Sequence, residues 1–232
     1  LGGAGREPIM SITCYSVLVP DTRPSAELVI RRSRFIGFAG RVDTEEQARD
    51  FLTDIRRAHR GVRHVCHAFV LGSWRATQRS SDDGEPAGTA GGPILKAILT
   101  RATDTGRADL SDVVVAVVRY FGGIKLGTGG LVQAYSATAT QTLEQARLLT
   151  RQRMRLLVIS VPIGETGRLD SVLRASGIRI LATDYLAEQA VLQIAVPDEP
   201  DEVTAVTRRL ATWTGGRISA EPGGRTQWFD LD

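Results

Sequence analysis

The chain has 232 residues, of which 42% are hydrophobic and 24% charged, and its formal net charge is +3. This composition is typical of a soluble, folded globular protein and excludes a disordered chain. The longest apolar run, Val113–Val118, is too short to cross a bilayer, and no signal peptide is visible. Two cysteines, Cys14 and Cys66, cannot build a disulfide framework. We therefore expect a cytoplasmic protein with no membrane partner.

The first predicted elements are strands over 14–19 and 34–42, after residues 1–9, which precede Met10 and are left out of the fold prediction. Asp43 or Thr44 is expected to cap a helix that runs to about residue 59, because apolar residues then recur at helical spacing and Gly61 follows. The charges are uneven along the chain: residues 1–152 hold 20 Lys+Arg against 15 Asp+Glu. The first part is the better candidate for a polyanion surface.

A strand predicted over 62–71 contains His64, Cys66 and His67. Because side chains alternate along a strand, His64 and Cys66 share one face and His67 lies on the other. A zinc site needs about four converging ligands, and no further Cys/His group supplies them. We expect no metal site here, and a buried, inert role for Cys66.

The segment 72–81 is predicted to be a loop, leading to a glycine-rich acidic loop over 82–93. Its carboxylates, Asp82, Asp83 and Glu85, have two interpretations: they bind a cation or exchange protons, or they accept backbone hydrogen bonds within the turn. Pro93 is then expected at the first position of a helix over 94–102.

The apolar run Val113–Val118 predicts a central strand covered on both faces. Arg119 and Tyr120 follow at its end, and Lys125 lies in a second, basic glycine-rich loop over 119–130. This loop opens a helix predicted over 131–148, whose free N–H groups are suited to an anion. The loop has neither the Walker A spacing nor a dinucleotide fingerprint, so no nucleotide type is predicted.

A charged hinge over 151–155 is the predicted boundary between two domains, 1–152 and 153–232. The second part shows the order strand, helix, strand, strand, helix, extended segment. This βαββαβ order predicts a ferredoxin-like domain, with a bulge or break at residues 222–224.

The two glycine-rich loops, DDGEPAGTAGGP and RYFGGIKLGTGGLVQAYSATA, resemble the signature of the IMPACT/YigZ family over about residues 15–150. The resemblance implies an α+β protein. Its first domain would have the fold of a ribosomal small-subunit protein domain, with a left-handed βαβ crossover, and its second would resemble domains of elongation factor G. It implies a translation- or ribosome-associated role, with RNA, the ribosome or a regulatory protein as partner. No catalytic residue or cofactor carries over.

The resemblance also transfers motif positions that we expect to support a site. In the first strand and loop these are His64, Asp82, Asp83, Gly84, Glu85, Pro86 and Thr89, and in the second loop Gly122 and Gly123.

Our hypothesis from the sequence is RNA binding through the second loop, with its acidic partner holding it in place by ion pairs. Phosphate neutralisation, base stacking and the helix terminus are assigned to Arg119, Tyr120, Lys125, Gly127, Thr128, Gly129 and Gly130. Two alternatives stay open. One is an enzyme in which the acidic loop holds Mg²⁺ and the glycine loop takes the phosphate of a nucleotide; the other is a protein-interaction module of translational control.

Overall fold

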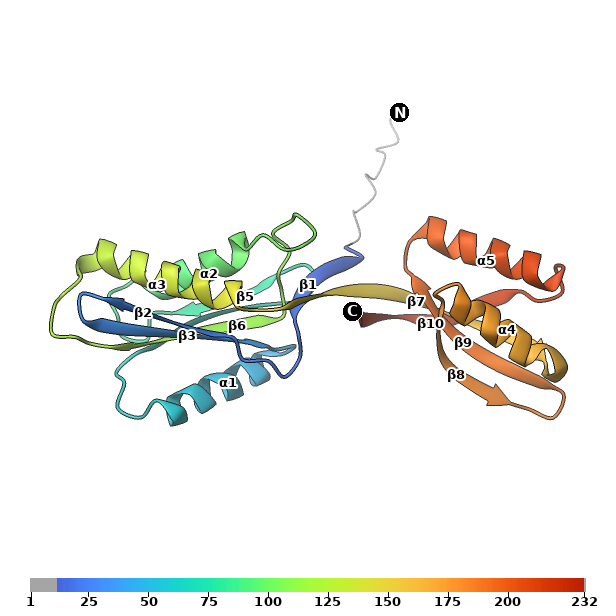
Figure 1. Ribbon diagram of the computed structural model, residues 1–232, viewed down its shortest axis with the longest axis horizontal. Coiled ribbons are helices and arrows are strands. Elements are labelled where there is room, and N and C mark those ends of the chain that lie inside the picture. Colours follow the sequence, from blue (N-terminus) through green and yellow to red (C-terminus); the bar gives the residue numbers. More distant parts are fainter. Residues whose placement is uncertain (1–11, 232) are drawn as a thin grey trace, which may run out of the picture. The chain divides into compact units, whose positions relative to one another are not determined.

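The computed structural model describes residues 12–231, which divide into two compact units (Figure 1). One comprises Tyr15–Thr150, and the other comprises Arg151–Leu231 with residues 12–14. Strand β7 (Leu148–Pro162) passes from the first unit into the second. Strand β1 (Cys14–Leu18) belongs to the same sheet as β7.

The first unit is built on a five-stranded sheet of order β2-β3-β6-β4-β5. The strands are β2 (Ser25–Ile30), β3 (Ser33–Arg41), β4 (Val65–Leu71), β5 (Thr77–Ser81) and β6 (Val113–Tyr120). Its helices are α1 (Glu45–Ala58), α2 (Gly91–Thr100) and α3 (Gly127–Glu144). All neighbouring strands of this sheet are antiparallel.

Strand β6 is the central strand and is covered on both faces, as predicted. Val113, Val115 and Val117 pack in one core with residues of α2 and α3. Val114, Ala116 and Val118 pack in a second core with α1. The sheet is thus the middle layer of three (Figure 1). Continuing the alternation, Arg119 falls on the α2/α3 face and Tyr120 on the α1 face.

The sheet contains a crossover of the unusual left hand, which the family resemblance implied. Strands β3 and β4 are parallel, because both are antiparallel to β6, and α1 connects them. Strands β5 and β6 are likewise parallel, and α2 connects them in the opposite direction across the sheet. Because α1 and α2 cover opposite faces, the two crossovers have opposite hands, and one of them departs from the right-handed rule.

The second unit has the predicted βαββαβ order. Its elements after β7 are α4 (Ile163–Ala175), β8 (Arg179–Tyr185), β9 (Gln189–Pro197), α5 (Pro200–Thr214) and β10 (Ala220–Leu231). The strand order is β8-β9-β7, with β10 on the other side of β7. The strands therefore lie in the order 2-3-1-4, counted from β7 as 1, which is the ferredoxin-like arrangement, and α4 and α5 pack in one core with the sheet.

Several boundaries differ from the predictions. Strand β2 was not predicted, and 77–81 is a strand rather than a loop; both lie at edges of the sheet. Helix α2 begins at Gly91 and not at Pro93, because Asp82 accepts the N–H groups of Ala90 and Gly91 and so starts the helix earlier. Helix α3 begins at Gly127, so the glycines form its first turn, and it ends at Glu144.

The charged segment 151–155 is not a hinge, since it lies inside strand β7. Its arginines are held by a carboxylate: Arg153 and Arg155 each donate to Asp198, whose side chain is 7% exposed. At 222–224, where a bulge or break was predicted, strand β10 is continuous, and Gly224 is a local irregularity with a positive φ of 92°.

Candidate phosphate-binding site

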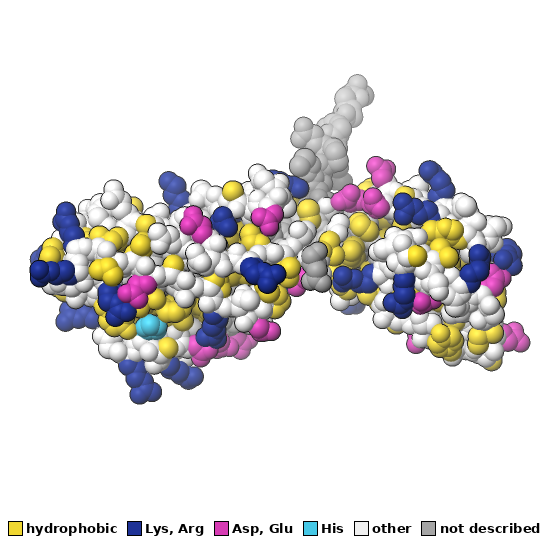
Figure 2. Space-filling view, viewed as in Figure 1, with side chains coloured by type: hydrophobic (Ala, Val, Ile, Leu, Met, Phe, Trp, Pro, Cys, Tyr) yellow, Lys and Arg dark blue, Asp and Glu magenta, His cyan; other side chains and the backbone are white. Residues whose placement is uncertain are grey.

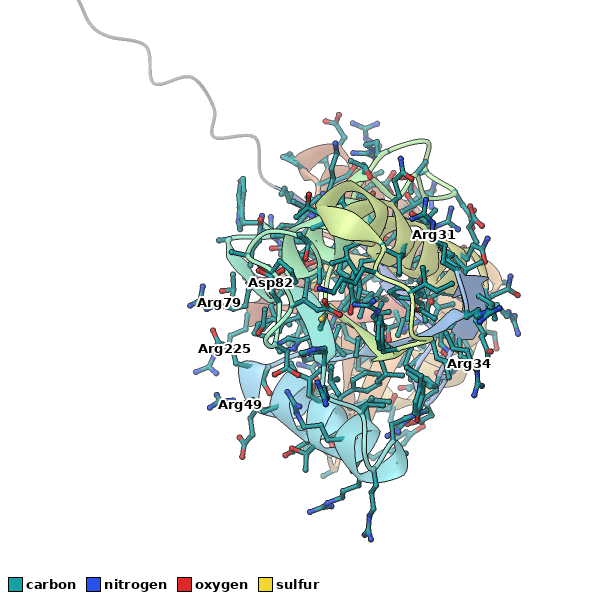
Figure 3. The ribbon with its side chains drawn as sticks, turned by 90° about the vertical axis from the view of Figure 1, so that its left-hand side faces the viewer. Arg31, Arg34, Arg49, Arg79, Asp82 and Arg225 are labelled. Atoms are coloured by element: carbon teal, nitrogen blue, oxygen red, sulfur yellow. The ribbon has the colours of Figure 1, made fainter. Side chains whose placement is uncertain are left out.

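A cavity of about 810 Å³ lies at the end of the first unit's sheet, where β6 ends and β4 begins. Figure 3 looks onto this end, with Asp82 to one side and Arg31 and Arg34 to the other. Eight of the predicted residues line it: His64, Glu85, Pro86, Arg119, Tyr120, Lys125, Gly127 and Thr128. The other predicted positions do not: Asp82, Asp83, Gly84, Thr89, Gly122, Gly123, Gly129 and Gly130.

The floor of the cavity is a buried ion pair between the two glycine-rich loops. Nη1 of Arg119 donates to both carboxylate oxygens of Glu85, at 2.8 and 3.1 Å. The hydroxyl of Tyr135, in α3, donates to the same carboxylate at 2.9 Å. The side chains of Glu85 and Arg119 are 3% and 9% exposed. The pair therefore fixes the end of β6 against the first loop, as predicted for Glu85.

Asp82 has a different role, because its carboxylate serves as the anion for the N-terminus of α2. Its two oxygens accept hydrogen bonds from the N–H groups of Gly88, Ala90 and Gly91, at 2.8 to 2.9 Å. Partial burial alone raises the pKa of Asp82, but these hydrogen bonds outweigh it, and the pKa lies below its ordinary value. The N-terminus of α2 is thus already occupied.

Asp83 has partners different from those of Glu85 and Asp82. Its carboxylate accepts from the N–H of Val65 at 2.6 Å and from Arg56 at 2.9 Å. Burial raises the pKa of Asp83, and the hydrogen bonds from Arg56 and Val65 lower it further than burial raises it. Asp82 and Asp83 therefore do not pair with the basic loop. The three carboxylates diverge, which does not support their joint binding of Mg²⁺.

The N-terminus of α3 contrasts with that of α2. Leu126, at its cap position, offers no side-chain hydrogen bond. In the described chain no side chain accepts from the N–H groups of Gly127 to Gly130. Lys125 and Thr128 are exposed beside this end. An uncapped helix N-terminus with an adjacent lysine attracts anions, because the N–H groups and the helix dipole both favour negative charge.

The two aromatic residues that end β6 differ in availability. The hydroxyl of Tyr120 lies 3.0 Å from Nδ1 of His59, the residue after α1, and its ring is half-buried. Phe121 is 60% exposed, and the guanidinium of Arg119 lies over its ring, 5.4 Å from the centroid. Phe121 is therefore the more accessible stacking surface of the two.

The β2–β3 hairpin places further arginines at this end of the unit. Ile30 pairs with Ser33, so Arg31 and Arg32 form a two-residue turn, and both have positive φ, 47° and 66°. A Cβ on Gly122 would lie 2.0 Å from the carbonyl oxygen of Arg32, so glycine is required where the second loop crosses the turn. Figure 2 shows basic and apolar side chains together at this end.

The histidines and Cys66 are engaged in structure. Nδ1 of His64 lies 2.7 Å from the carbonyl oxygen of Asp83, and the Cys66 thiol donates to the carbonyl oxygen of Asp82. Burial raises the pKa of Cys66 to about 12. Within residues 12–231, no three His, Cys, Asp or Glu side chains are grouped to hold a metal ion. Over the same residues, no helix has the length and apolarity to span a membrane.

The cavity also contains a residue that the sequence interpretation missed. Arg63 is exposed, lies in the turn that leads into β4, and lines the cavity with Gly61 and Val62. No motif marks it. The available signal was topological: β4 runs antiparallel to β6, so the turn before β4 has to meet the loop after β6.

The fold and the two-unit order define an α+β protein with a three-layered first domain and a ferredoxin-like second domain. The model of the Impact N-terminal domain matches residues 31–143, and that of a domain of unknown function (DUF1949) matches residues 161–217. The chain belongs to the IMPACT family, as its loops indicated.

Relatives match over most of their length. The IMPACT family member YvyE of Bacillus subtilis is 34% identical over 200 residues, covering 86% of this chain and 88% of the relative. The IMPACT family member YigZ of Escherichia coli is 32% identical over 205 residues, covering 88% and 96%. A crystal structure of a hypothetical protein superposes with a TM-score of 0.58 at 29% identity, covering 93% of this chain and all of that one.

Proposed function

We propose that this protein is a translation-associated regulatory protein that binds single-stranded RNA at the cavity between its glycine-rich loops. Membership of the IMPACT family supports the translation-associated role at the level of the family. The observation that carries RNA binding is the uncapped N-terminus of α3, which lies beside exposed Lys125 and shares the cavity with exposed Arg63.

The side chains take partly different roles from those first assigned. Lys125, Arg63 and the α3 terminus contact phosphates. Phe121 supplies the stacking surface, because its ring is exposed and base stacking on an aromatic ring is worth about 1–3 kcal/mol per base. Arg119 positions the end of β6 through its pair with Glu85, and as a residue that lines the cavity it is a further donor to phosphate. Tyr120 forms the wall on the α1 side, held by His59.

The chain offers a matched control, since Lys96 and Lys125 are its only lysines and both are exposed. Lys96 lies in α2 and does not line the cavity. Fluorescence anisotropy of a short single-stranded RNA at several salt concentrations compares Lys125→Ala with Lys96→Ala. Losing one phosphate contact lowers the slope of log K against log salt by about 0.7 for a single strand.

We expect that lowered slope for Lys125→Ala and the wild-type slope for Lys96→Ala. Equal slopes for the two variants would place RNA binding elsewhere. No salt-dependent binding by the wild type would overturn the proposed function.

A further inference from the structure

We infer that the cavity receives a terminal phosphomonoester of an RNA chain, so that the protein recognises a phosphorylated RNA end rather than internal phosphodiesters. This inference rests on the proposed function and specifies its ligand. The observations that carry it are the charge of the cavity, the unused donors of Arg119, and the open space at Gly129.

The charges that line the cavity match a dianion. Glu85 offsets the charge of Arg119, to which it is bonded. Lys125 and Arg63 add two positive charges, and the N-terminus of α3 adds about half a charge. A phosphomonoester carries a charge of about −1.5 to −2 at neutral pH, whereas an internal phosphodiester carries one.

Arg119 retains unused donors in this setting. Its side chain is nine-tenths buried and lines the cavity, and within residues 12–231 its side-chain hydrogen bonds come from Nη1 alone. Nε is buried without a hydrogen-bond partner. Among residues 12–231, Glu85 is the one side chain that accepts from this guanidinium. Buried polar groups are ordinarily satisfied, and an arginine fork matches phosphate oxygens, so this residue is poised for an anionic ligand.

The first turn of α3 holds a glycine for which the protein itself shows no requirement. Gly129 has a helical backbone, and a Cβ built on it meets no atom within 4 Å. Alanine is a better helix former than glycine at such a position. Gly129 follows Gly127 and Thr128, which line the cavity. Without a Cβ it leaves the first turn of α3 open to a phosphate that approaches the N–H groups.

The cavity volume suits one end of a chain. At about 810 Å³ it lies within the range of small-molecule sites and holds a nucleotide with its phosphate, not a duplex. The exposed ring of Phe121, on its border, is available to the base that follows.

The test uses the full chain and one RNA sequence, labelled internally and prepared with a 5′-phosphate, a 3′-phosphate or hydroxyls at both ends. We expect one phosphorylated form to bind at least tenfold more tightly than the hydroxyl form, which assigns the end. A nucleoside monophosphate with the same terminal group should compete if the isolated end suffices.

Two alanine variants distinguish a loss of RNA-end binding from a loss of folding. Gly92, in the first turn of α2, also meets nothing within 4 Å, but the N-terminus of that helix is occupied by the carboxylate of Asp82. Gly129→Ala and Gly92→Ala should both fold with unchanged or higher melting temperature. Only Gly129→Ala should lose the preference for the phosphorylated end.

Equal, salt-dependent binding of all three RNAs would overturn the end specificity and leave the proposed function standing. Binding of none of them would overturn both. A preference that Gly129→Ala retains would place the end away from the α3 terminus and overturn the assigned site.

Discussion

The carboxylate of Glu85 accepts two hydrogen bonds from Nη1 of Arg119 in a pair that is almost fully buried. The pair joins the acidic loop to the end of the central strand. It joins the two glycine-rich loops into one structural unit. Because Glu85 and Nη1 of Arg119 are bonded to each other, a ligand has to be bound by other groups of the loops.

Replacing Glu85 by Gln should destabilise the first unit strongly, because Arg119 would keep a buried charge without a counterion. Breaking a buried pair from one side costs about 3–5 kcal/mol, which chemical denaturation would measure. The matched control is Glu27→Gln, which breaks the exposed pair of Glu27 with Arg34. A loss for Glu85→Gln no larger than that of the control would contradict the buried pair.

Because the carboxylate of Asp82 accepts three backbone hydrogen bonds, part of the free energy of unfolding should be lost as the pH becomes acidic. The pKa of Asp82 is lowered in the folded state, so its stabilisation is complete above the ordinary aspartate pKa of about 3.9. It is lost as the pH falls below that value through the folded pKa. The difference in unfolding free energy between wild type and Asp82→Asn should therefore shrink between about pH 6 and pH 3.

Replacing the two arginines of the β2–β3 turn should stabilise the protein and weaken its binding to RNA. Arg31 and Arg32 occupy left-handed conformations that cost about 1 kcal/mol or more each, and Asn-Gly suits this turn. Arg31→Asn/Arg32→Gly should raise the melting temperature and weaken RNA binding. Arg31→Gln/Arg32→Gln removes the same charges without the better turn, so it should weaken binding without stabilising the protein. Full RNA affinity in both variants would show that the turn does not contact RNA.

Cys66 should resist thiol reagents in the folded protein. Burial raises its pKa to about 12, so roughly one thiol in 10⁴ is ionised at pH 8. In a Cys14→Ser variant, which leaves this thiol alone, we expect no modification under native conditions and one equivalent after denaturation. Rapid labelling of the native variant would be incompatible with a buried thiol at this position.

The elements predicted correctly are those whose sequence pattern fits only one kind of secondary structure. Six consecutive apolar residues in β6 indicate a strand covered on both faces, and Thr44 followed by helical spacing indicates α1, where Thr44 accepts from the N–H of Gln47. The turn at Arg31 and Arg32 was missed because two arginines carry no turn signal. The segment 151–155 was misjudged because Arg153 and Arg155 are paired with Asp198 and Arg151 with Asp230, which sequence spacing does not reveal.

The site was predicted in part for the same kind of reason. Lys125, Gly127 and Thr128 were assigned to it and line the cavity. Arg119 and Tyr120 are adjacent in sequence, but strand alternation sends them toward different helices. Tyr135, which donates to the carboxylate of the Arg119 pair, is separated from Glu85 by 50 positions in the sequence. Such partners depend on packing, so only the structure identifies them.

The position of β6 in its sheet has a consequence for the order in which the first unit forms. It lies between β3 and β4, yet it is made after every other strand of that sheet. Until residue 120 leaves the ribosome, β3 and β4 have unfilled edges that can pair with other chains. The last strand to arrive closes both edges and brings Arg119 to Glu85, so in a nascent chain the compact sheet and the buried ion pair form in one late step.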